Sequence, residues 1–421
     1  MSKRTKAILT ALAGLMLLVI LVLQIPAVKS AIAWRVEKYT LYVKNIIDPP
    51  GPVPTALPVT PAPPMQTSEV FAEHPRSTAE GAETSEVSTP TVTPPPTATA
   101  APLPSQVSLT SPPFELQTPN NCGPATLSMA LHLYGWEGSQ ADIAALIKPV
   151  LQDRNVNPEE MAYYIRTNAG WLNVQYRVSG DLTMLKKLLA ARYPVIVESV
   201  TGLDPNDALG PNDDLWAAHY LLLTGYDDTT QTFTIQDSYH GADLTIPYEQ
   251  LLAEWEPFNN LYMVLYFPGN EAELQSLLGT DWDPDVNRQH SLEIAQAATE
   301  ANPDDAYAWF NLGSNLVYFE RYEEAALAYD KSREIGLPLR MFRYQFGPFI
   351  AYFHSGRNDD LLVLTDYARG VTEMSEEAWL WYGWGLYRQN DFKGAKAAWE
   401  KALSINDSIY VDARNALQYV Q

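Results

Sequence analysis

Cysteine is almost absent from the 421-residue chain, which contains Cys122 and no other. A single thiol excludes disulfide bonds within the chain and any metal site built from cysteines. Basic residues are also scarce, because 28 Lys and Arg stand against 50 Asp and Glu and give a formal net charge of −22. Nucleic-acid binding needs a basic face, so this balance argues against it. A chain of this length holds two domains plus linkers.

The N-terminus carries a long uncharged run behind Lys3, Arg4 and Lys6. The run spans residues 7–28, about the length that a helix needs to cross a bilayer. Its positive flank predicts a cytoplasmic N-terminus, with the rest of the chain outside. A cleaved signal peptide is the alternative, since residues 31–33 (Ala-Ile-Ala) have the small-x-small form of a cleavage site. The length of the run favours an uncleaved signal-anchor in the cell membrane, with a cytoplasmic tip, span and juxtamembrane segment over residues 1–47.

Residues 48–104 are rich in Pro, Thr, Ala and Ser, as in the stretch Thr-Pro-Thr-Val-Thr-Pro-Pro-Pro-Thr over residues 89–97. Such a composition cannot bury a core, and it predicts an extended, disordered stalk. The stalk is expected to hold the next domain away from the membrane.

The only cysteine stands where a buried helix is expected to begin. Asn120 and Asn121 are good N-cap residues, and Pro124 is tolerated in a first helical turn. The run over residues 125–134 is almost wholly apolar, with Gly135 as a stop. Free backbone N–H groups and the positive end of the helix dipole favour thiolate over thiol at such a tip. The alternative is that Cys122 is a small buried apolar residue.

Within residues 105–268, patterns typical of helices come first and patterns typical of antiparallel strands come later. This order is typical of an α+β domain. Helices are expected over 140–148, 158–168 and 182–191 and from residue 248, and strands over 171–178, 194–200, 217–226, 232–236 and 261–267. The loop over residues 203–214 is acidic and has three interpretations: it binds basic substrate residues, it binds a cation, or it is a solvated loop. We prefer the last interpretation.

A predicted hairpin supplies a histidine and a carboxylate. His219 lies near the start of its first strand, and Asp237 directly follows its second. With the turn centred near Asp228, the two become cross-strand partners on one face, with Cβ atoms roughly 5 Å apart. The spacing allows Asp237 to orient His219, which would act as base toward Cys122. The alternative is a core histidine and a turn aspartate, and His240 in the following turn is the second candidate for the base.

Gln117 five residues ahead, a Cys122-Gly-Pro helix start and the later His219 and Asp237 together resemble papain-fold cysteine peptidases. More closely, they resemble cysteine peptidase family 39, the relatives of double-glycine leader peptidases, over about residues 105–268. The resemblance implies a papain-like domain in which Gln117 supplies an oxyanion-hole donor, Cys122 attacks, and His219 and Asp237 complete the site. It implies no metal or organic cofactor. Leader-peptide cleavage is not implied, since the transporter-linked relatives act beside an ATP-binding domain that these residues do not contain.

From about residue 284 the pattern changes to helical pairs with a period near 34. Two units have characteristic residues at the same internal spacing. The first unit contains Trp309, Leu312, Gly313, Ala325, Tyr329 and Pro338, and the second contains Trp379, Tyr382, Gly383, Ala395, Trp399 and Ala402. They resemble tetratricopeptide repeats, in which small residues let paired helices approach closely. A degenerate unit around Gly347 and Asp359 lies between them. Residues 269–421 are therefore expected to form an all-α repeat domain that binds a protein or peptide partner.

The sequence thus predicts a membrane-anchored, extracytoplasmic cysteine peptidase with a peptide or protein substrate. Two alternatives stay open. One is an amidase or acyl transferase that uses the same thiol chemistry, and the other is a non-catalytic repeat scaffold with a degenerate peptidase-like domain.

Overall fold

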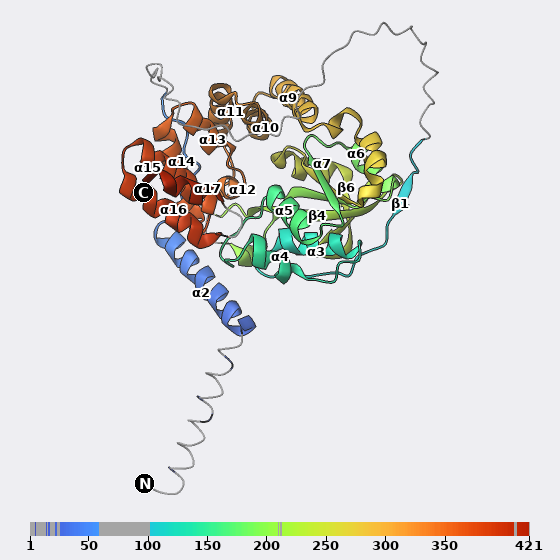
Figure 1. The fold of residues 1–421 in the computed structure, drawn as a ribbon, viewed down its shortest axis with the longest axis horizontal. Coiled ribbons are helices and arrows are strands. Elements are labelled where there is room, and N and C mark those ends of the chain that lie inside the picture. The colour runs from blue at the N-terminus through green and yellow to red at the C-terminus, as the bar shows by residue number, and fades with distance from the viewer. Residues whose placement is uncertain are drawn as a thin grey trace.

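A computed structural model describes most of the chain as two folded parts that lie against each other (Figure 1). The described residues are 26–58, 102–208, 213–407 and 411–420, together with Thr5, Gly14, Met16, Val22 and Gly210. The sheet domain comes first, and a helical repeat domain follows it. This order confirms the predicted α+β domain followed by an all-α repeat domain.

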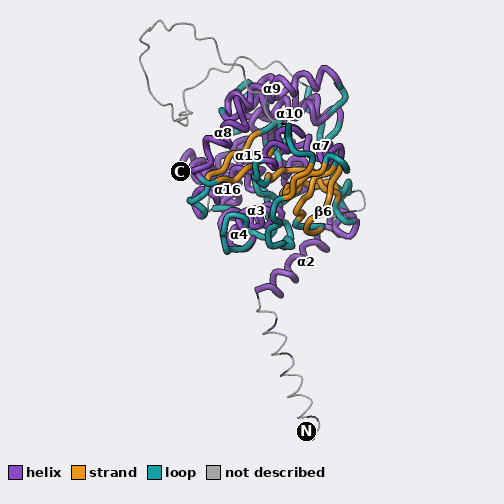
Figure 2. Tube along the Cα trace, turned by 90° about the vertical axis from the view of Figure 1, so that its right-hand side faces the viewer, coloured by secondary structure: helices purple, strands orange, loops and turns teal. Residues whose placement is uncertain are grey.

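A seven-stranded antiparallel sheet forms the centre of the first domain, as the strand layer in Figure 2 shows. Its strands are β1 (Gln106–Ser108), β2 (Asn173–Arg177), β3 (Val195–Gly202), β4 (Trp216–Asp227), β5 (Thr232–Asp237), β6 (Gly241–Pro247) and β7 (Tyr262–Tyr266). The order is β2-β7-β3-β4-β5-β6, and β1 pairs with the end of β4. The strands β1 and β6 were not predicted from the sequence.

Helices cover both faces of this sheet. The first face packs against α3 (Cys122–His132), α4 (Gln140–Ile147) and α5 (Pro158–Asn168), and the second packs against α6 (Leu182–Ala190), α7 (Tyr248–Trp255) and α8 (Glu271–Leu278). Side chains of β3 point alternately to the two faces of the sheet. Ile196 packs in the core on the first face, whereas Val195 and Val197 pack in the core on the second face. Residues two apart in a strand share a face, so β3 is apolar on both sides.

The repeat domain is built from paired helices. They are α9 (Pro284–Ala301), α10 (Ala306–Tyr318), α11 (Tyr322–Ile335), α12 (Met341–Tyr344), α13 (Gly347–His354), α14 (Asn358–Val371), α15 (Glu376–Arg388), α16 (Phe392–Ile405) and α17 (Val411–Ala416). Short 3-10 turns lie at η1 (Pro205–Asp207), η2 (Glu256–Phe258), η3 (Pro268–Asn270), η4 (Gly279–Trp282) and η5 (Leu417–Val420). A Cβ atom on Gly383 would come within 2.4 Å of the Trp399 ring, which explains the glycine at this helix crossing.

The two domains share a polar interface. The Arg340 guanidinium before α12 pairs with Asp213 and Asp214, and donates to the Trp216 carbonyl at 3.1 Å. At the other end, the Asn406 amide donates to the Ile147 carbonyl at 3.0 Å. Part of the acidic loop over 203–214 is therefore a docking surface for the repeat domain rather than a fully solvated loop.

The helix α2 (Pro26–Ile47) and the residues after it also contact the folded body. The Lys38 ammonium lies 2.6 Å from the Asp207 carboxylate of the sheet domain. Further on, Val53 is buried in the core of the repeat domain, and Arg333 donates to the Pro54 carbonyl at 2.8 Å. A disordered stalk was expected from residue 48, but residues 49–58 lie on the repeats because their apolar and carbonyl groups find partners there.

Several predictions fall on residues that the structure leaves out. Most of the predicted membrane-spanning run over 7–28, and the rest of the predicted stalk over 59–101, lie outside the described residues. Within the described ranges, no helix has both the length and the apolar character that a bilayer crossing requires.

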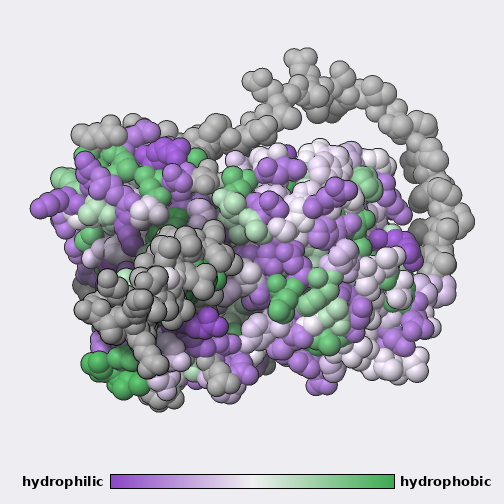
Figure 3. Space-filling view, turned by 90° about the horizontal axis from the view of Figure 1, so that it is seen from below, coloured by the Kyte–Doolittle hydropathy of each residue, from purple (hydrophilic) through white to green (hydrophobic). Residues whose placement is uncertain are grey.

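The surface fits the acidic composition of the chain. On the face that Figure 3 shows, hydrophilic residues alternate with small hydrophobic groups. The large apolar side chains are mostly inside, in cores such as the one around Phe310 and Tyr329 of the repeat domain. Burial of this apolar area is the main term that stabilises each domain.

Candidate active site

The tip of α3 presents the Cys122 thiol at the edge of the sheet. The helix is buried along almost its whole length, from Gly123 to Leu131, whereas Cys122 itself is partly exposed. Its entry is tight, because a Cβ atom on residue 123 would lie 3.1 Å from Val156, so a glycine fits this position best. The apolar run that predicted a buried helix is thus what anchors the thiol.

His219 and Asp237 meet beside this tip. Nε2 of His219 lies 2.7 Å from Oδ1 of Asp237, and both residues are buried. The thiol of Cys122 lines the same pocket as this imidazole, and its interaction with His219 lowers the pKa of Cys122. Because Asp237 occupies Nε2, the nitrogen that remains for the thiol is Nδ1. The structure therefore brings three of the predicted site residues together, with His219 between the thiol and the carboxylate.

The register that joins them differs from the expected one. Leu222 pairs with Gln236, so the next position places Asp237 opposite residue 221 rather than opposite His219. The reason is that the turn between Asp227 and Thr232 is centred about one and a half residues later than Asp228, and a bulge between Leu223 and Gly225 takes back one residue. The error is two positions, which keeps both side chains on one face as diagonal neighbours.

Asp237 accepts more hydrogen bonds than the sequence suggested. Its Oδ1 accepts from the backbone N–H groups of Tyr239 at 2.8 Å and His240 at 3.0 Å, and its Oδ2 lies 2.7 Å from Nδ1 of His240. Burial alone would raise the pKa of Asp237, but the bonds to His219 and His240 outweigh it and hold that pKa well below its usual range. His240 therefore contacts the carboxylate and is not a member of the Cys122–His219 pair.

The protonation states of Cys122 and His219 support each other. Burial disfavours both charged forms, yet the pKa of Cys122 is lowered because its thiolate accepts from His219 and from the backbone N–H groups of Tyr220 and Gly123. Burial likewise opposes the imidazolium, but hydrogen bonds to Asp237 and Cys122 raise the pKa of His219 to about 9. A thiolate–imidazolium pair is thus the favoured state near neutral pH.

Gln117 enters the site from the segment before α3. Its Oε1 accepts a hydrogen bond from the Ser238 hydroxyl at 2.9 Å, and its backbone N–H donates to the Ser238 carbonyl at 2.8 Å. These bonds fix the orientation of the carboxamide and leave the Nε2 donors for the pocket that Gln117 lines with Cys122. Such a donor can stabilise negative charge on an oxygen near the thiol.

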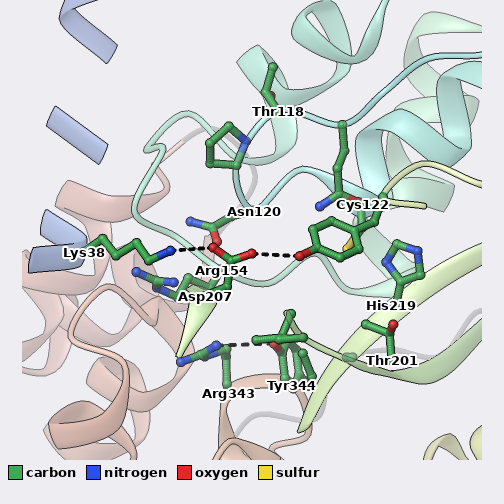
Figure 4. Close-up of a pocket in the computed structure, with 16 residues that line it drawn as sticks. Lys38, Thr118, Asn120, Cys122, Arg154, Thr201, Asp207, His219, Arg343 and Tyr344 are labelled. Atoms are coloured by element: carbon green, nitrogen blue, oxygen red, sulfur yellow. Dashed lines mark hydrogen bonds and ion pairs between the residues drawn. The ribbon is translucent and has the colours of Figure 1, made fainter. Parts of the chain in front are cut away.

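Cys122, His219 and Gln117 border a pocket of about 240 Å³ (Figure 4), whereas Asp237 is not part of its lining. Its walls come from three parts of the chain. The sheet domain supplies Cys122 and His219, α2 supplies Lys38, and α12 of the repeat domain supplies Arg343 and Tyr344. Sequence reasoning missed the last three, because nothing in the sequence indicates how the domains dock. Ser238 and Tyr239 were also missed, although they directly follow Asp237.

Other candidates have local roles. Nε2 of His132 lies 2.8 Å from the Gly138 carbonyl, away from the pocket lining. Trp216 stacks on Phe258 at 5.9 Å between ring centroids, so it packs in the domain interface. In the part of the chain that the structure describes, no group of three or more His, Cys, Asp or Glu residues is arranged to hold a metal ion.

Two family models match the chain and confirm both resemblances. Residues 101–263 match the model of the Peptidase_C39 like family, and residues 376–409 match the model of the tetratricopeptide repeat. No curated protein matches the chain. Residues 101–263 are therefore similar to the C39-like peptidase family, and residues 376–409 are similar to the tetratricopeptide repeat.

Solved structures resemble one or the other part of the chain. A C39-like peptidase from Bacillus anthracis has 17% identity and a TM-score of 0.30, and the match covers 38% of this chain and 97% of that one. Xylellain, a cysteine protease from Xylella fastidiosa, has 18% identity and a TM-score of 0.30, over 39% of this chain and 87% of its own. The tetratricopeptide repeat protein YrrB, described as having an unusual peptide-binding site, has 19% identity and a TM-score of 0.27, over 36% and 74%.

Proposed function

We propose that this chain is a membrane-anchored cysteine peptidase whose catalytic and repeat domains lie on the extracytoplasmic side. The observation that carries the proposal is the placement of Cys122 and His219 side by side in the pocket lining, with Asp237 hydrogen-bonded to the far nitrogen of the imidazole at 2.7 Å. A buried imidazole between a thiol and a carboxylate is the arrangement that makes a thiolate nucleophilic near neutral pH.

In the first half of the reaction, the Cys122 thiolate attacks the carbonyl carbon of a peptide bond and forms a C–S bond. The carbonyl electron pair moves onto oxygen, where Nε2 of Gln117 and the backbone N–H of Cys122 stabilise the negative charge. The His219 imidazolium then gives its proton to the leaving amine as the C–N bond breaks. Asp237 keeps the imidazole oriented and stabilises its charged form.

In the second half, water attacks the thioester. His219, now neutral, takes a proton from that water as the new C–O bond forms. The C–S bond then breaks, the acid product leaves and the thiolate–imidazolium pair is restored. Every proton in this cycle passes through one imidazole, which explains why its second nitrogen has a buried carboxylate as partner.

The repeat domain is proposed to bind a protein or peptide partner. A groove of about 490 Å³ runs along α10 and α11, where Trp309 and Leu312 line it and Leu327 has an exposed fraction of 60%. Exposed apolar side chains in a groove are a common basis for helical-repeat binding.

The membrane anchor is proposed for residues 7–28. From residue 28 to Lys38 is ten residues (38 − 28), or about 15 Å along a helix. Lys38 lines the pocket, so this anchor would place the pocket close to the bilayer surface. Segments of membrane-bound or membrane-proximal proteins are then the substrates within reach. In intact cells, a membrane-impermeant thiol reagent should label Cys122 without permeabilisation. Labelling that requires permeabilised cells would contradict the proposed orientation.

Peptide cleavage tests the activity. The full chain in detergent and its Cys122→Ala variant are incubated with a diverse peptide mixture, and new termini are identified by mass spectrometry. Products with the full chain and none with Cys122→Ala are expected. Transfer of acyl groups to added amines, or loss of side-chain amides without backbone cleavage, would indicate the amidase or acyl transferase alternative. The absence of any Cys122-dependent product would favour the repeat scaffold.

A further inference from the structure

The pocket is basic although the chain is strongly acidic. Three cationic side chains line it, namely Lys38, Arg154 and Arg343, against the single carboxylate of Asp207. Asp207 is already engaged, because it accepts from Lys38 at 2.6 Å and from the Tyr239 hydroxyl at 2.7 Å. In the view of Figure 4, Cys122 and His219 lie on one side and the cationic groups on the other. Cationic side chains therefore outnumber carboxylates three to one in the lining of this pocket.

Arg343 is the unusual member of this set. It is 5% exposed, and among the described residues its guanidinium bonds only to hydroxyls. Nε donates to Thr372 at 2.7 Å and Nη1 to Tyr344 at 3.4 Å, while Nη2 is buried without a hydrogen-bond partner. A buried cation with a free donor is costly unless an anion completes it.

Neighbouring buried arginines show what Arg343 lacks. Arg340, three positions earlier, pairs with the carboxylates of Asp213 and Asp214. Arg333 lies 3.5 Å from Asp360. Arg333 stabilises the repeat domain and Arg340 joins that domain to the sheet domain, and each has an acidic partner within the chain. Arg343, in contrast, has neutral partners and faces the pocket of the thiol.

A second guanidinium strengthens the case. The positive charge of Arg154 reaches Arg343, and together with burial, the largest cause, it lowers the pKa of Arg343 to about 10. The side chain is therefore still cationic near neutral pH. Since both guanidinium groups line the same pocket, an anion that bonds to Arg343 there would lie near a second positive charge.

We infer that Arg343, with Arg154 beside it, selects peptide substrates that carry a carboxylate near the scissile bond. This inference rests on the proposed peptidase activity. An acidic side chain and a free C-terminal carboxylate share the chemistry that a guanidinium fork recognises. Because Arg343 belongs to α12, the repeat domain supplies part of the specificity of the catalytic domain.

The test uses peptides in matched pairs. Each peptide is made with Glu and with Gln at every position next to the cleaved bonds, and with a free and an amidated C-terminus. The full chain is expected to cleave the acidic forms about 10-fold to 100-fold more efficiently, the range for one charge-assisted hydrogen bond. A preference that follows Glu assigns the anion to a side chain, and one that follows the free terminus assigns it to the C-terminal carboxylate.

Three variants isolate Arg343. In Arg343→Gln, the ratio of the cleavage efficiency for acidic peptides to that for neutral peptides should fall close to one. Arg343→Lys should keep part of the preference for acidic peptides. Arg414→Gln, at an exposed position of α17, removes the same charge and should leave the ratio unchanged. Because the readout is a ratio, a partly unfolded variant still gives an interpretable result. No acidic preference in the full chain, or the same ratio in Arg343→Gln, would overturn the inference.

Alkylation separates this inference from the proposed activity. Iodoacetate carries a carboxylate and iodoacetamide a neutral amide, while both transfer their CH₂ group to the thiolate with loss of iodide. If no peptide is cleaved, the peptidase proposal fails, but the anion site still predicts a several-fold drop in the iodoacetate to iodoacetamide rate ratio at Cys122 in Arg343→Gln. An unchanged ratio would reject the anion site itself.

Discussion

Nε2 of His219 lies 2.7 Å from Oδ1 of Asp237, and both side chains are withdrawn from solvent. The bond leaves Nδ1 of the imidazole for the Cys122 thiol. It also explains why burial does not discharge the histidine, since the carboxylate and the thiolate together raise its pKa to about 9. The reactivity of the site therefore depends on a carboxylate that does not contact the thiol.

Replacing Asp237 by Asn should narrow the active pH range from its alkaline side. Nδ1 must keep its proton for the leaving amine, so activity in the unmodified chain should decline as pH rises through about 9. Asn keeps a hydrogen-bond acceptor but removes the charge, so the pKa of His219 should fall toward its ordinary value near 6.5. Peptide cleavage measured from pH 5 to pH 10 checks this. Equal alkaline limbs in both proteins would show that Asp237 does not set the protonation of His219.

Gln117 should matter for cleavage and not for thiolate formation. Replacement by Ala removes a donor to the oxyanion, which costs about 100-fold to 1,000-fold in turnover in comparable sites. Alkylation of Cys122 by iodoacetamide forms no oxyanion, so its rate should hardly change. Ser238→Ala, which loses only the bond that orients the amide at 2.9 Å, should have a smaller effect on cleavage. A parallel loss of alkylation in Gln117→Ala would instead indicate a collapsed site.

Local patterns in the sequence predicted most of the sheet domain. The capped helices and the β-branched strands depend on neighbouring residues. For example, α6 begins after Asp181, whose side chain accepts a hydrogen bond from the Met184 N–H. It was also predictable that His219 and Asp237 share one face of the sheet. Side chains alternate between the two faces, so a register error of two positions leaves them on the same face. The weakly apolar β6, exposed at five of its seven positions as an edge strand, gave little signal.

What the sequence could not predict arises from contacts between distant segments. Arg343 and Lys38 reach the pocket only because the repeat domain and α2 dock beside it. Val53 lies in a stretch whose composition indicates disorder, yet the repeat domain buries it. Such contacts depend on the shapes of two folded surfaces, which no local pattern encodes.

Buried acids at the domain interface should make stability depend on pH. Asp153, Glu160, Glu376 and Glu377 are all nearly inaccessible and lie close together, with Lys148 as the neighbouring cation. Burial, aided by mutual repulsion, raises the pKa of Asp153 to about 7 and raises the pKa values of the three glutamates. In the unfolded chain these groups ionise near pH 4. Their interactions are therefore most favourable below pH 4, and stability is lost as pH rises through about 7.

Glu376→Gln should remove part of the stability that the folded chain loses as pH rises. Oε1 of Glu376 accepts from Asn406 at 3.2 Å, and a glutamine oxygen can take over that bond, while Oε2 is buried without a partner. The variant should unfold at a higher temperature than the unmodified chain at pH 8 and at nearly the same temperature at pH 5. Glu334→Gln, whose side chain is 69% exposed, serves as the control and should match the unmodified chain at both values. A gain that is equal at both pH values would contradict the assignment.

Residues 49–58 should be protected from proteolysis by the repeat domain. Val53→Asp places a charge in the buried site, which costs several kcal/mol and should release this segment. Limited proteolysis of the full chain should then cut within residues 49–58 much faster than before. Leu57→Ser is the matched control, because the side chain of Leu57 is exposed and its backbone N–H still donates to Asp360 at 2.9 Å. Rapid cutting of the unmodified chain in this segment would argue against the docking.

The rate of Cys122 alkylation by iodoacetamide at pH 6.5, in the full chain and in His219→Ala, tests the central claim most directly. Because the chain has one cysteine, every label reports on this thiol. A free thiol with a pKa near 8.5 is about 1% ionised at pH 6.5, so loss of the imidazolium should slow labelling by about 100-fold. In denaturant the two proteins should react equally. Equal rates in the folded proteins would mean that His219 does not activate Cys122, and the account of the site as a peptidase centre would fail.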